Sequence, residues 1–228
     1  SGGRSYKEHQ ALESAISGGI SASISARAAT DDATQLRAIL TLSGKGLVVN
    51  QAALSELMAD MLVSAPFNET ARIAELLNQN ASRKEQSVTG QGHSLAILAA
   101  SAGLAPGAGF SHASRGLPSI KLARELAESS DESQLNALAE ELRSIHKAIM
   151  ASSPKALLIA DSEHKESCLR QFEKEFARLS TGKLDNSFKV STEALVKKQA
   201  WIVNTQVNFC AKVFRSVTVA HPDAAALT

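Results

Sequence analysis

The sequence predicts an α+β fold in which an antiparallel or mixed sheet packs against helices in two layers, and three observations support it. Residues 20–27 alternate between apolar and polar side chains, which is the period of a strand with one buried side. A second apolar segment, 36–42, follows a polar turn, so the two strands form an antiparallel pair. Helical spacing of apolar residues dominates the chain from there to residue 179. The face of the first strand that we expect to be buried consists of Ile20, Ala22, Ile24 and Ala26.

Helices are expected wherever apolar residues recur three and four positions apart. We expect them over 5–16, 50–65, 68–102, 119–128, 131–151 and 163–179. Gly18-Gly19 ends the first, Asn50 caps the second, and Gly90-Gln91-Gly92 breaks the third. Residues 103–116 are rich in glycine and contain Pro106, which predicts a loop. The short apolar run at 156–160 predicts a strand.

The last fifth of the chain predicts a second structural unit. Residues 181–188 are polar and contain glycine, aspartate and asparagine, which favours a linker. We therefore expect one α+β domain over 1–180, followed by a linker and opening strands of a next domain over 181–228. The β-prone segments are 200–203, 207–213 and 217–219. Pro222 and the alanines after it resemble a helix start that is too short to be stable, so we expect the chain to be a piece of a longer polypeptide.

Composition excludes several classes of function. The chain has 228 residues, 44% of them apolar, which is enough for a core. Its 24 basic and 23 acidic residues, with 4% aromatics, give no electrostatic footprint for nucleic acid. No apolar stretch reaches the length of a membrane span, and the start lacks the pattern of a signal peptide. We expect a cytoplasmic protein, with an organellar or periplasmic setting as open alternatives. Cys168 and Cys210 lack metal or disulfide spacing, which predicts buried, reduced thiols.

Several short segments, taken in order, resemble a known family. They are Ser5-Tyr6, Gly18-Gly19-Ile20-Ser21-Ala22-Ser23, Phe67-Asn68-Glu69 with Arg72 and Leu76-Leu77-Asn78-Gln79, Gly92-His93-Ser94-Leu95-Ala96, Ala200-Trp201-Ile202-Val203 and His221-Pro222-Asp223-Ala224-Ala225-Ala226-Leu227. Together they resemble the pitrilysin/insulinase family of zinc peptidases, of the presequence-protease type. The resemblance covers nearly the whole chain, as the third of four homologous domains plus the start of the fourth.

The resemblance implies a particular role for the chain. Members of this family enclose a chamber in which peptides are cut, and their zinc is held in the first domain by H-x-x-E-H and a distant Glu. This sequence contains no H-x-x-E-H, and its nearest approach is Ala160-Asp161-Ser162-Glu163-His164, with alanine at the first ligand position. The resemblance also implies a strand and a helix before Tyr6, so the domain is expected to be incomplete at both ends. We therefore expect no catalytic, cofactor-binding or metal-binding residue in this chain, with zinc bound elsewhere in the parent enzyme.

Single residues that could carry chemistry have plainer interpretations. His93, beside the glycines of the broken helix, is expected to cap or pack, because no second ligand lies at metal spacing. We expect the remaining candidates to be surface residues, and they are Glu8, His9, Glu69, Glu75, Glu85, His112, His146 and His221. None of the serines lies in G-x-S-x-G, and Gly90-Gln91-Gly92 lacks the strand and the Lys-Ser/Thr of a phosphate loop.

Two interpretations of function remain open. The first is a non-catalytic domain of a zinc metalloendopeptidase that degrades peptides, forming part of the wall of the substrate chamber and contacting the other domains and the peptide. The second is a stand-alone interaction or scaffold module in which the apolar helix stripes bind a partner. An H-x-x-E-H upstream in the same reading frame would favour the first. Because a domain without its first strand and helix leaves apolar sheet surface uncovered, we also expect the isolated chain to self-associate.

Overall fold

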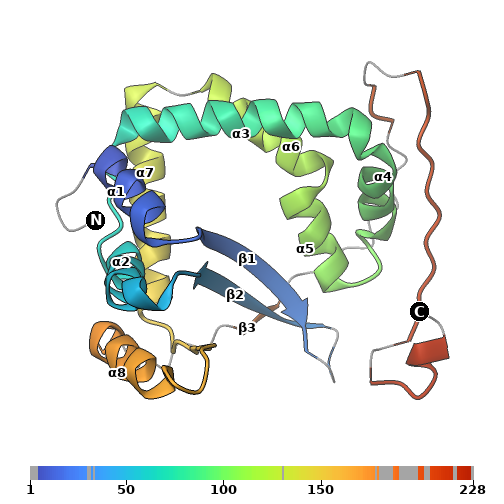
Figure 1. The fold of residues 1–228 in the computed structure, drawn as a ribbon. Helices are drawn as coiled ribbons and strands as arrows, with labels where there is room; N and C mark the ends of the chain where they lie inside the picture. The colour runs from blue at the N-terminus through green and yellow to red at the C-terminus, as the bar shows by residue number, and fades with distance from the viewer. Residues whose placement is uncertain are drawn as a thin grey trace. The chain divides into compact units, whose positions relative to one another are not determined.

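The computed structural model describes residues 5–29, 32, 34–129, 131–177, 179, 187–189, 200–202, 206–217 and 220–226 (Figure 1). It contains helices and a sheet, and the predicted α+β class is confirmed. The elements are α1 (Tyr6–Ile16), β1 (Ile20–Ala28), β2 (Gln35–Gly44), η1 (Val48–Asn50), α2 (Gln51–Val63), α3 (Thr70–Gly90), α4 (Gly92–Ser101), α5 (Pro106–Arg115), α6 (Leu117–Glu128), α7 (Glu132–Met150), α8 (Lys165–Phe176), β3 (Ser187–Lys189) and η2 (Ala224–Ala226). None of the helices described is long and apolar enough to cross a membrane.

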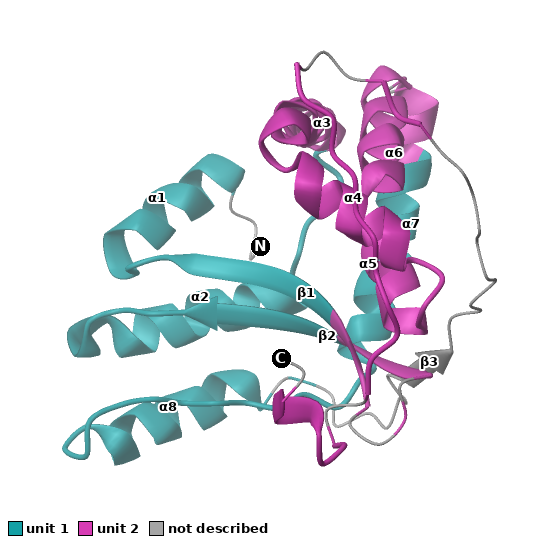
Figure 2. Cartoon of the chain, turned by 90° about the vertical axis from the view of Figure 1, so that its right-hand side faces the viewer, with its two compact units in different colours: residues 1–25, 39–69, 137–186 teal, residues 26–38, 70–136, 187–228 magenta. Residues whose placement is uncertain are grey.

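The chain divides into two compact units that alternate along the sequence (Figure 2). Unit 1 consists of residues 1–25, 39–69 and 137–186, and unit 2 of residues 26–38, 70–136 and 187–228. The predicted boundary at 180/181 lies outside the described residues, and the division into domains 1–180 and 181–228 stays a prediction.

The sheet has the strand order β1-β2-β3 within the described part of the chain. A polar turn joins β1 and β2, as predicted, and β2 pairs antiparallel with β3, with Leu36 opposite Phe188. Gly19, just before β1, has a φ of +120°, a conformation that favours glycine and follows the end of α1. The predicted burial of one face of β1 is wrong for Ala22 and for Ile24, which is 74% exposed, whereas Ile20 and Ala26 are partly buried. The alternation therefore predicted the strand correctly, but it did not predict whether another element buries the apolar face of the strand.

Unit 1 is organised around α2, which contacts α1 and α8. Leu57 and Ala59 of α2 are 1% and 0% exposed and form part of the core. At the end of β2, Gly44 allows Met58 of α2 to approach, since a Cβ at this glycine would lie 2.6 Å from the Met58 sulfur. The aromatic rings of Phe172 and Phe176 stack within α8, with centroids 4.2 Å apart.

Polar side chains lie at the starts of helices α1 and α2 in unit 1. Ser5 and Glu8 form a capping box at the start of α1, as the helix prediction over 5–16 requires. Asn50 occupies the N-cap position of α2, but its side chain makes no capping bond. Its Nδ2 instead donates to the carbonyl oxygen of Ile16 at 3.2 Å, so Asn50 ties the end of α1 to the start of α2. The predicted capping role is therefore wrong in mechanism, because Asn50 acts as a donor to α1 and its side-chain oxygen accepts no amide of α2.

Unit 2 is built mainly from α3, α4, α5 and α6, and the predicted break at Gln91 separates α3 from α4. Helix α3 contacts α6, and α5 contacts both α4 and α6. Lys84 of α3 donates to the hydroxyl of Ser119 at 2.9 Å, and Ser119 is 8% exposed. Arg124 of α6 and Glu85 of α3 form an ion pair at 2.6 Å. Leu36 of β2, fully buried, belongs to this unit as well.

The predicted loop at 103–116 is wrong, because it contains α5. Pro106 is the first residue of this helix, a position where its missing amide hydrogen costs nothing. The glycines then allow close approach: a Cβ at Gly107 would touch the buried Leu36, and one at Gly109 would lie 3.1 Å from the carbonyl oxygen of Ala102. Packing against α4 and α6 therefore outweighs the weak helix propensity of glycine.

Three strand predictions in the second half of the chain are also wrong over the residues that the structure describes. Residues 156–160 form no strand, and Leu157 and Ile159 are 84% and 86% exposed. The described residues of the segments 200–203 and 207–213 form no strand either, and residues 208–217 are neither helix nor strand. Residues 218 and 219 lie outside the described part of the chain, as does most of the predicted linker, whose end forms β3. Apolar runs of this length do not reveal whether a pairing partner is present.

We predict that Leu57→Ala lowers the free energy of unfolding by about 2–5 kcal/mol, because it leaves a cavity in a buried site. The matched control is Ile159→Ala in the same unit, where the side chain is already 86% exposed. This second change should shift stability by less than about 0.5 kcal/mol. Urea unfolding followed by circular dichroism measures both, and equal losses for the two variants would contradict the core described above.

A second prediction concerns the start of α4. A Cβ at the buried Gly92 would overlap the ring of Phe209, whereas a Cβ at Gly90 would meet nothing within 4 Å. We expect Gly92→Ala to displace Phe209, to lower stability by about 1–3 kcal/mol and to speed tryptic cleavage after Lys212 and Arg215. Gly90→Ala is the matched control and should change stability by no more than about 1 kcal/mol. Unchanged cleavage in the Gly92 variant would show that Phe209 does not hold this segment.

Candidate functional site

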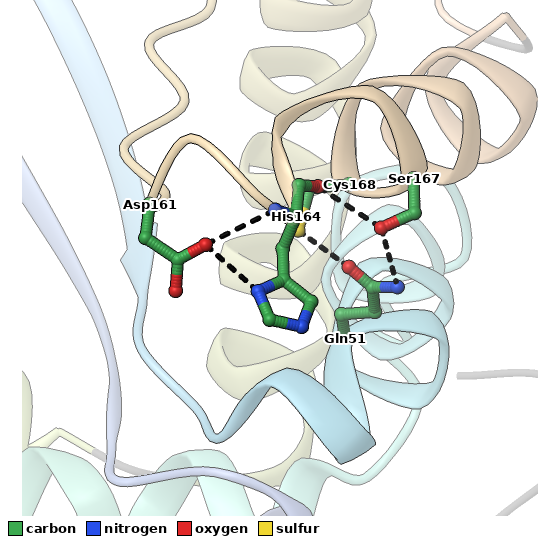
Figure 3. A network of polar contacts seen from close by, with 5 residues as sticks. All are labelled: Gln51, Asp161, His164, Ser167 and Cys168. Carbon is green, nitrogen blue, oxygen red and sulfur yellow. Dashed lines mark hydrogen bonds and ion pairs between the residues drawn. The ribbon is translucent and has the colours of Figure 1, made fainter.

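A network of polar side chains joins the start of α8 to the start of α2 in unit 1 (Figure 3). It includes the segment that comes nearest to the H-x-x-E-H motif, so it is the strongest candidate for a functional site. Its members are Gln51, Asp161, His164, Ser167 and Cys168. Helix α8 supplies Ser167 and Cys168, the turn before it supplies Asp161 and His164, and α2 supplies Gln51.

Asp161 and His164 form a dyad in the turn that leads into α8. One carboxylate oxygen of Asp161 accepts from the backbone amide of His164 at 3.0 Å and from its Nδ1 at 2.7 Å. Because a carboxylate can only accept, Nδ1 carries the proton. The hydrogen bonds from the His164 side chain and backbone lower the pKa of the Asp161 carboxyl below its ordinary value of 3.8. Both side chains are substantially exposed, at 41% for His164 and 60% for Asp161, so the ion pair is a weak one.

Gln51 bonds to two residues in the first turns of α8. Its Nε2 donates to the hydroxyl of Ser167 at 3.4 Å, and its Oε1 accepts from the thiol of Cys168. Ser167 in turn donates to the carbonyl oxygen of His164 at 2.9 Å. Both the nitrogen and the oxygen of the Gln51 amide thus bond to α8 and hold it against α2. Sequence reasoning missed this residue, because a lone glutamine carries no signal until the two helices are brought together.

The arrangement does not make a nucleophile. A serine or cysteine nucleophile needs a hydrogen bond to the base that activates it. In the described residues, the hydroxyl of Ser167 donates to a backbone carbonyl and the thiol of Cys168 to Gln51, and no hydrogen bond joins either to the His164 imidazole. Asp161 bonds to the amide of His164, three residues on, as in turns that start a helix. The polar network therefore stabilises the start of α8 and joins α8 to α2.

The residues of the near-motif do not fit a catalytic zinc. Such a site needs three protein ligands and an open position. Among the residues that the structure describes, no group of three or more His, Cys, Asp and Glu side chains is placed to hold a metal. In the near-motif, Ala160 has no ligand atom, and the Nδ1 of His164 is occupied by Asp161.

His146 is a structural residue rather than the surface residue predicted. It lies in α7, is half-buried, and its Nε2 donates to the carbonyl oxygen of Leu62 at 2.6 Å. Leu62 lies in the last turn of α2, whose carbonyls have no partner within the helix. The Phe67 ring packs against the imidazole, with ring centroids 5.5 Å apart. His146 therefore caps α2, which the apolar stripe of α7 alone could not predict.

His112 is also less exposed than predicted. It lies in the last turn of α5, and its buried Nδ1 has no hydrogen-bond partner among the described residues. Burial lowers the pKa of the imidazole below 6.5, because it penalises the charged form. The close approach of Gly116 explains the burial, since a Cβ there would lie 2.6 Å from Nδ1.

The remaining candidates are not members of the network. The sequence predicts that His93 caps or packs; the residue is exposed in the first turn of α4, whose N-cap residue is Gln91, so the packing alternative is wrong. Glu8 bonds to Ser5 in the capping box, and His9 beside it is partly buried. Glu75 and Glu85 are exposed and pair with Arg72 and Arg124, whereas Glu69 is partly buried. His221 is exposed, as predicted, and accepts from the amide of Asp223.

Cys168 is a free, partly buried thiol, and Cys210 is free but exposed, so the predicted burial of Cys210 is wrong.

The dyad makes a testable prediction about pH. His164→Ala should raise the pKa of Asp161 toward 3.8, because the largest stabilising bond to the carboxylate is lost. A lowered pKa in the folded state means that the dyad stabilises the fold above about pH 3.8 and that this contribution is lost as the pH falls through the lower value. Carbon-detected NMR titration of the Asp161 carboxyl measures the shift. Glu163→Gln is the control and should leave it nearly unchanged, and an equal titration in the wild type and His164→Ala would refute the assignment.

Comparison with known proteins places the chain in a family. A family model for the domain associated with peptidases of family M-16, subfamily C, matches residues 1–126, which is more than half of the 228 residues. The matched region runs from α1 into α6 and includes β1, β2 and Gln51 of the polar network. Comparison with curated proteins gives no match. The chain therefore belongs to this peptidase-associated family, a domain of the pitrilysin/insulinase peptidases, as the order of its sequence motifs predicted.

Proposed function

We propose that this chain is a non-catalytic domain of a zinc metalloendopeptidase of the presequence-protease type, and that it forms part of the wall of the chamber in which peptides are degraded. The observation that carries the proposal is the family match over residues 1–126 in a sequence without H-x-x-E-H. A peptidase domain that lacks the motif depends on another domain for its zinc and its general base.

The polar network supports a structural role for the near-motif. Asp161 and His164 start α8, and Gln51 connects α8 to α2. These side chains contribute to the packing of unit 1, and we propose that they make no contact with the reacting peptide bond. The chain's own part in catalysis is then to shape the chamber and exclude water from it.

We also propose a domain organisation and partners for the chain. Residues 1–180 would be the wall domain, and residues 181–228 would open the next homologous domain of the same polypeptide. The partners are then the other domains of the parent enzyme and the peptides enclosed by them. A stand-alone interaction module would instead bind its partner without an upstream H-x-x-E-H in the reading frame.

The first test uses the purified chain. After dialysis against zinc and then buffer, we expect far less than one zinc per chain by plasma mass spectrometry and no cleavage of an unstructured peptide, because no ligand set or base is assembled. Glu163→Gln and His164→Ala should leave both results unchanged. Stoichiometric zinc or a turnover that these variants abolish would overturn the non-catalytic assignment.

The same experiment continues with the product of the complete reading frame. We expect this polypeptide to bind zinc and to cleave the peptide, and a photoreactive peptide trapped in an inactive Glu→Gln variant of its motif should label residues of the present chain. Labelling confined to other domains would show that this chain does not line the chamber, and it would leave the family membership unaffected.

A further inference from the structure

The first strand of unit 1 has a free edge. In the order β1-β2-β3, β1 is an edge strand within the described part of the chain (Figure 1). Natural edge strands are usually protected from other chains by lysine, proline, bulges or cover. Residues 20–24 contain neither a charged residue nor a proline. The edge is therefore open to pairing with another strand.

The backbone of β1 shows which groups face this edge. The amide of Lys45 donates to the carbonyl oxygen of Gly19 at 3.3 Å, and the hydroxyls of Ser21 and Ser43 lie 2.9 Å apart. These contacts place Gly19 opposite Lys45 and Ser21 opposite Ser43. In an antiparallel pair, successive residues direct their N–H and C=O groups alternately toward and away from the neighbour. The odd-numbered residues thus bond to β2, and the even-numbered ones face the free edge.

One hydrogen bond supports this assignment independently. The amide of Ile20 donates to the carboxylate of Glu13 at 3.2 Å, which an amide directed at β2 would not do. Glu13 therefore satisfies the first donor on the free edge. The amides of Ala22 and Ile24 and the carbonyls of Ile20 and Ala22 remain directed outward by the same alternation.

The sequence of this strand is self-complementary. Residues 20–24 read Ile-Ser-Ala-Ser-Ile in both directions, with Ala22 at the centre. In an antiparallel pair of two copies centred on Ala22, Ile20 lies opposite Ile24, Ser21 opposite Ser23, and Ala22 opposite itself. No like charges meet, and apolar residues face apolar residues while serine faces serine. Such an isologous arrangement is the commonest way in which identical chains associate.

Exposure of the side chains supports the same partner. Ile24 is 74% exposed and Leu40, on the neighbouring strand, is 38% exposed. Ala22 and Ser23 are exposed as well. Pairing about Ala22 would place Ile20 of the second copy beside Ile24 and remove part of this apolar surface from water.

We propose that the free edge of β1 binds a second copy of this chain, through antiparallel pairing of residues 20–24 about a two-fold axis at Ala22. The amide of each Ala22 donates to the carbonyl oxygen of the other Ala22, and the amide of each Ile24 donates to the carbonyl oxygen of the other Ile20. The amide of each Ile20 exchanges its bond to Glu13 for one to the carbonyl oxygen of the other Ile24, because the two residues of such a pair exchange both bonds. This interface is independent of the proposed peptidase function, and its small size predicts a weak, rapidly exchanging dimer.

The two-fold axis makes a charge-reversal test possible. Ala22→Lys and Ala22→Glu each place like charges opposite one another, and each should weaken the dimer about fivefold in sedimentation equilibrium at up to about 0.5 mM chain. An equimolar mixture of the two variants places lysine opposite glutamate and should restore a one-to-one dimer. Ala148→Lys, the same change at an exposed alanine of α7, is the matched control and should dimerise as the wild type does.

The outcomes separate this interface from other modes of association. Because Ala22 is exposed, both variants should keep the circular dichroism spectrum of the wild type. A wild type that stays monomeric at about 0.5 mM overturns the proposal. Association that the Ala22 variants leave unchanged, or a mixture that fails to restore the dimer, places the interface elsewhere, for example at 206–217, and also overturns it.

Discussion

The packing of α2 is the constraint on which the rest of unit 1 depends. Its buried Leu57 and Ala59 give the unit its core, and the hairpin end approaches Met58 because residue 44 is a glycine. Polar contacts converge on the ends of the same helix: Asn50 bonds to α1, Gln51 to α8, and the carbonyl of Leu62 to His146 of α7. The apolar surface supplies the free energy, and the polar bonds select one arrangement of the neighbouring helices.

Polar residues that resembled a catalytic motif in the sequence serve this packing instead. Asp161 and His164 lie three residues apart because a turn that begins a helix uses that spacing, and a metal-binding helix uses a similar one. The hydrogen-bond partners show the difference, because the Asp161 carboxylate accepts from the His164 imidazole. The Cys168 thiol donates to Gln51, and the Ser167 hydroxyl donates to a backbone carbonyl. The family assignment rests on residues 1–126, so it does not depend on this segment at all.

The sheet shows a different balance between local pattern and environment. The Ser/Ile/Ala alternation specifies a strand, yet Ile24 is left 74% exposed and the edge beside it is free. An alternating pattern therefore predicts that a strand has an apolar face, but it does not show which element or which chain packs against that face. We propose that a second copy covers this edge in the isolated chain, because residues 20–24 are self-complementary.

The sequence by itself determined the α+β class, the family, the hairpin, and the break between α3 and α4, because each depends on local signals such as alternation, glycine and helical period. Only the tertiary structure decided that residues 106–115 are helical, since close packing of Gly107 and Gly109 offsets their poor propensity. It likewise decided the roles of Gln51 and His146. Their partners lie more than 80 positions away in the sequence, and a bond over that separation exists only once the helices have packed.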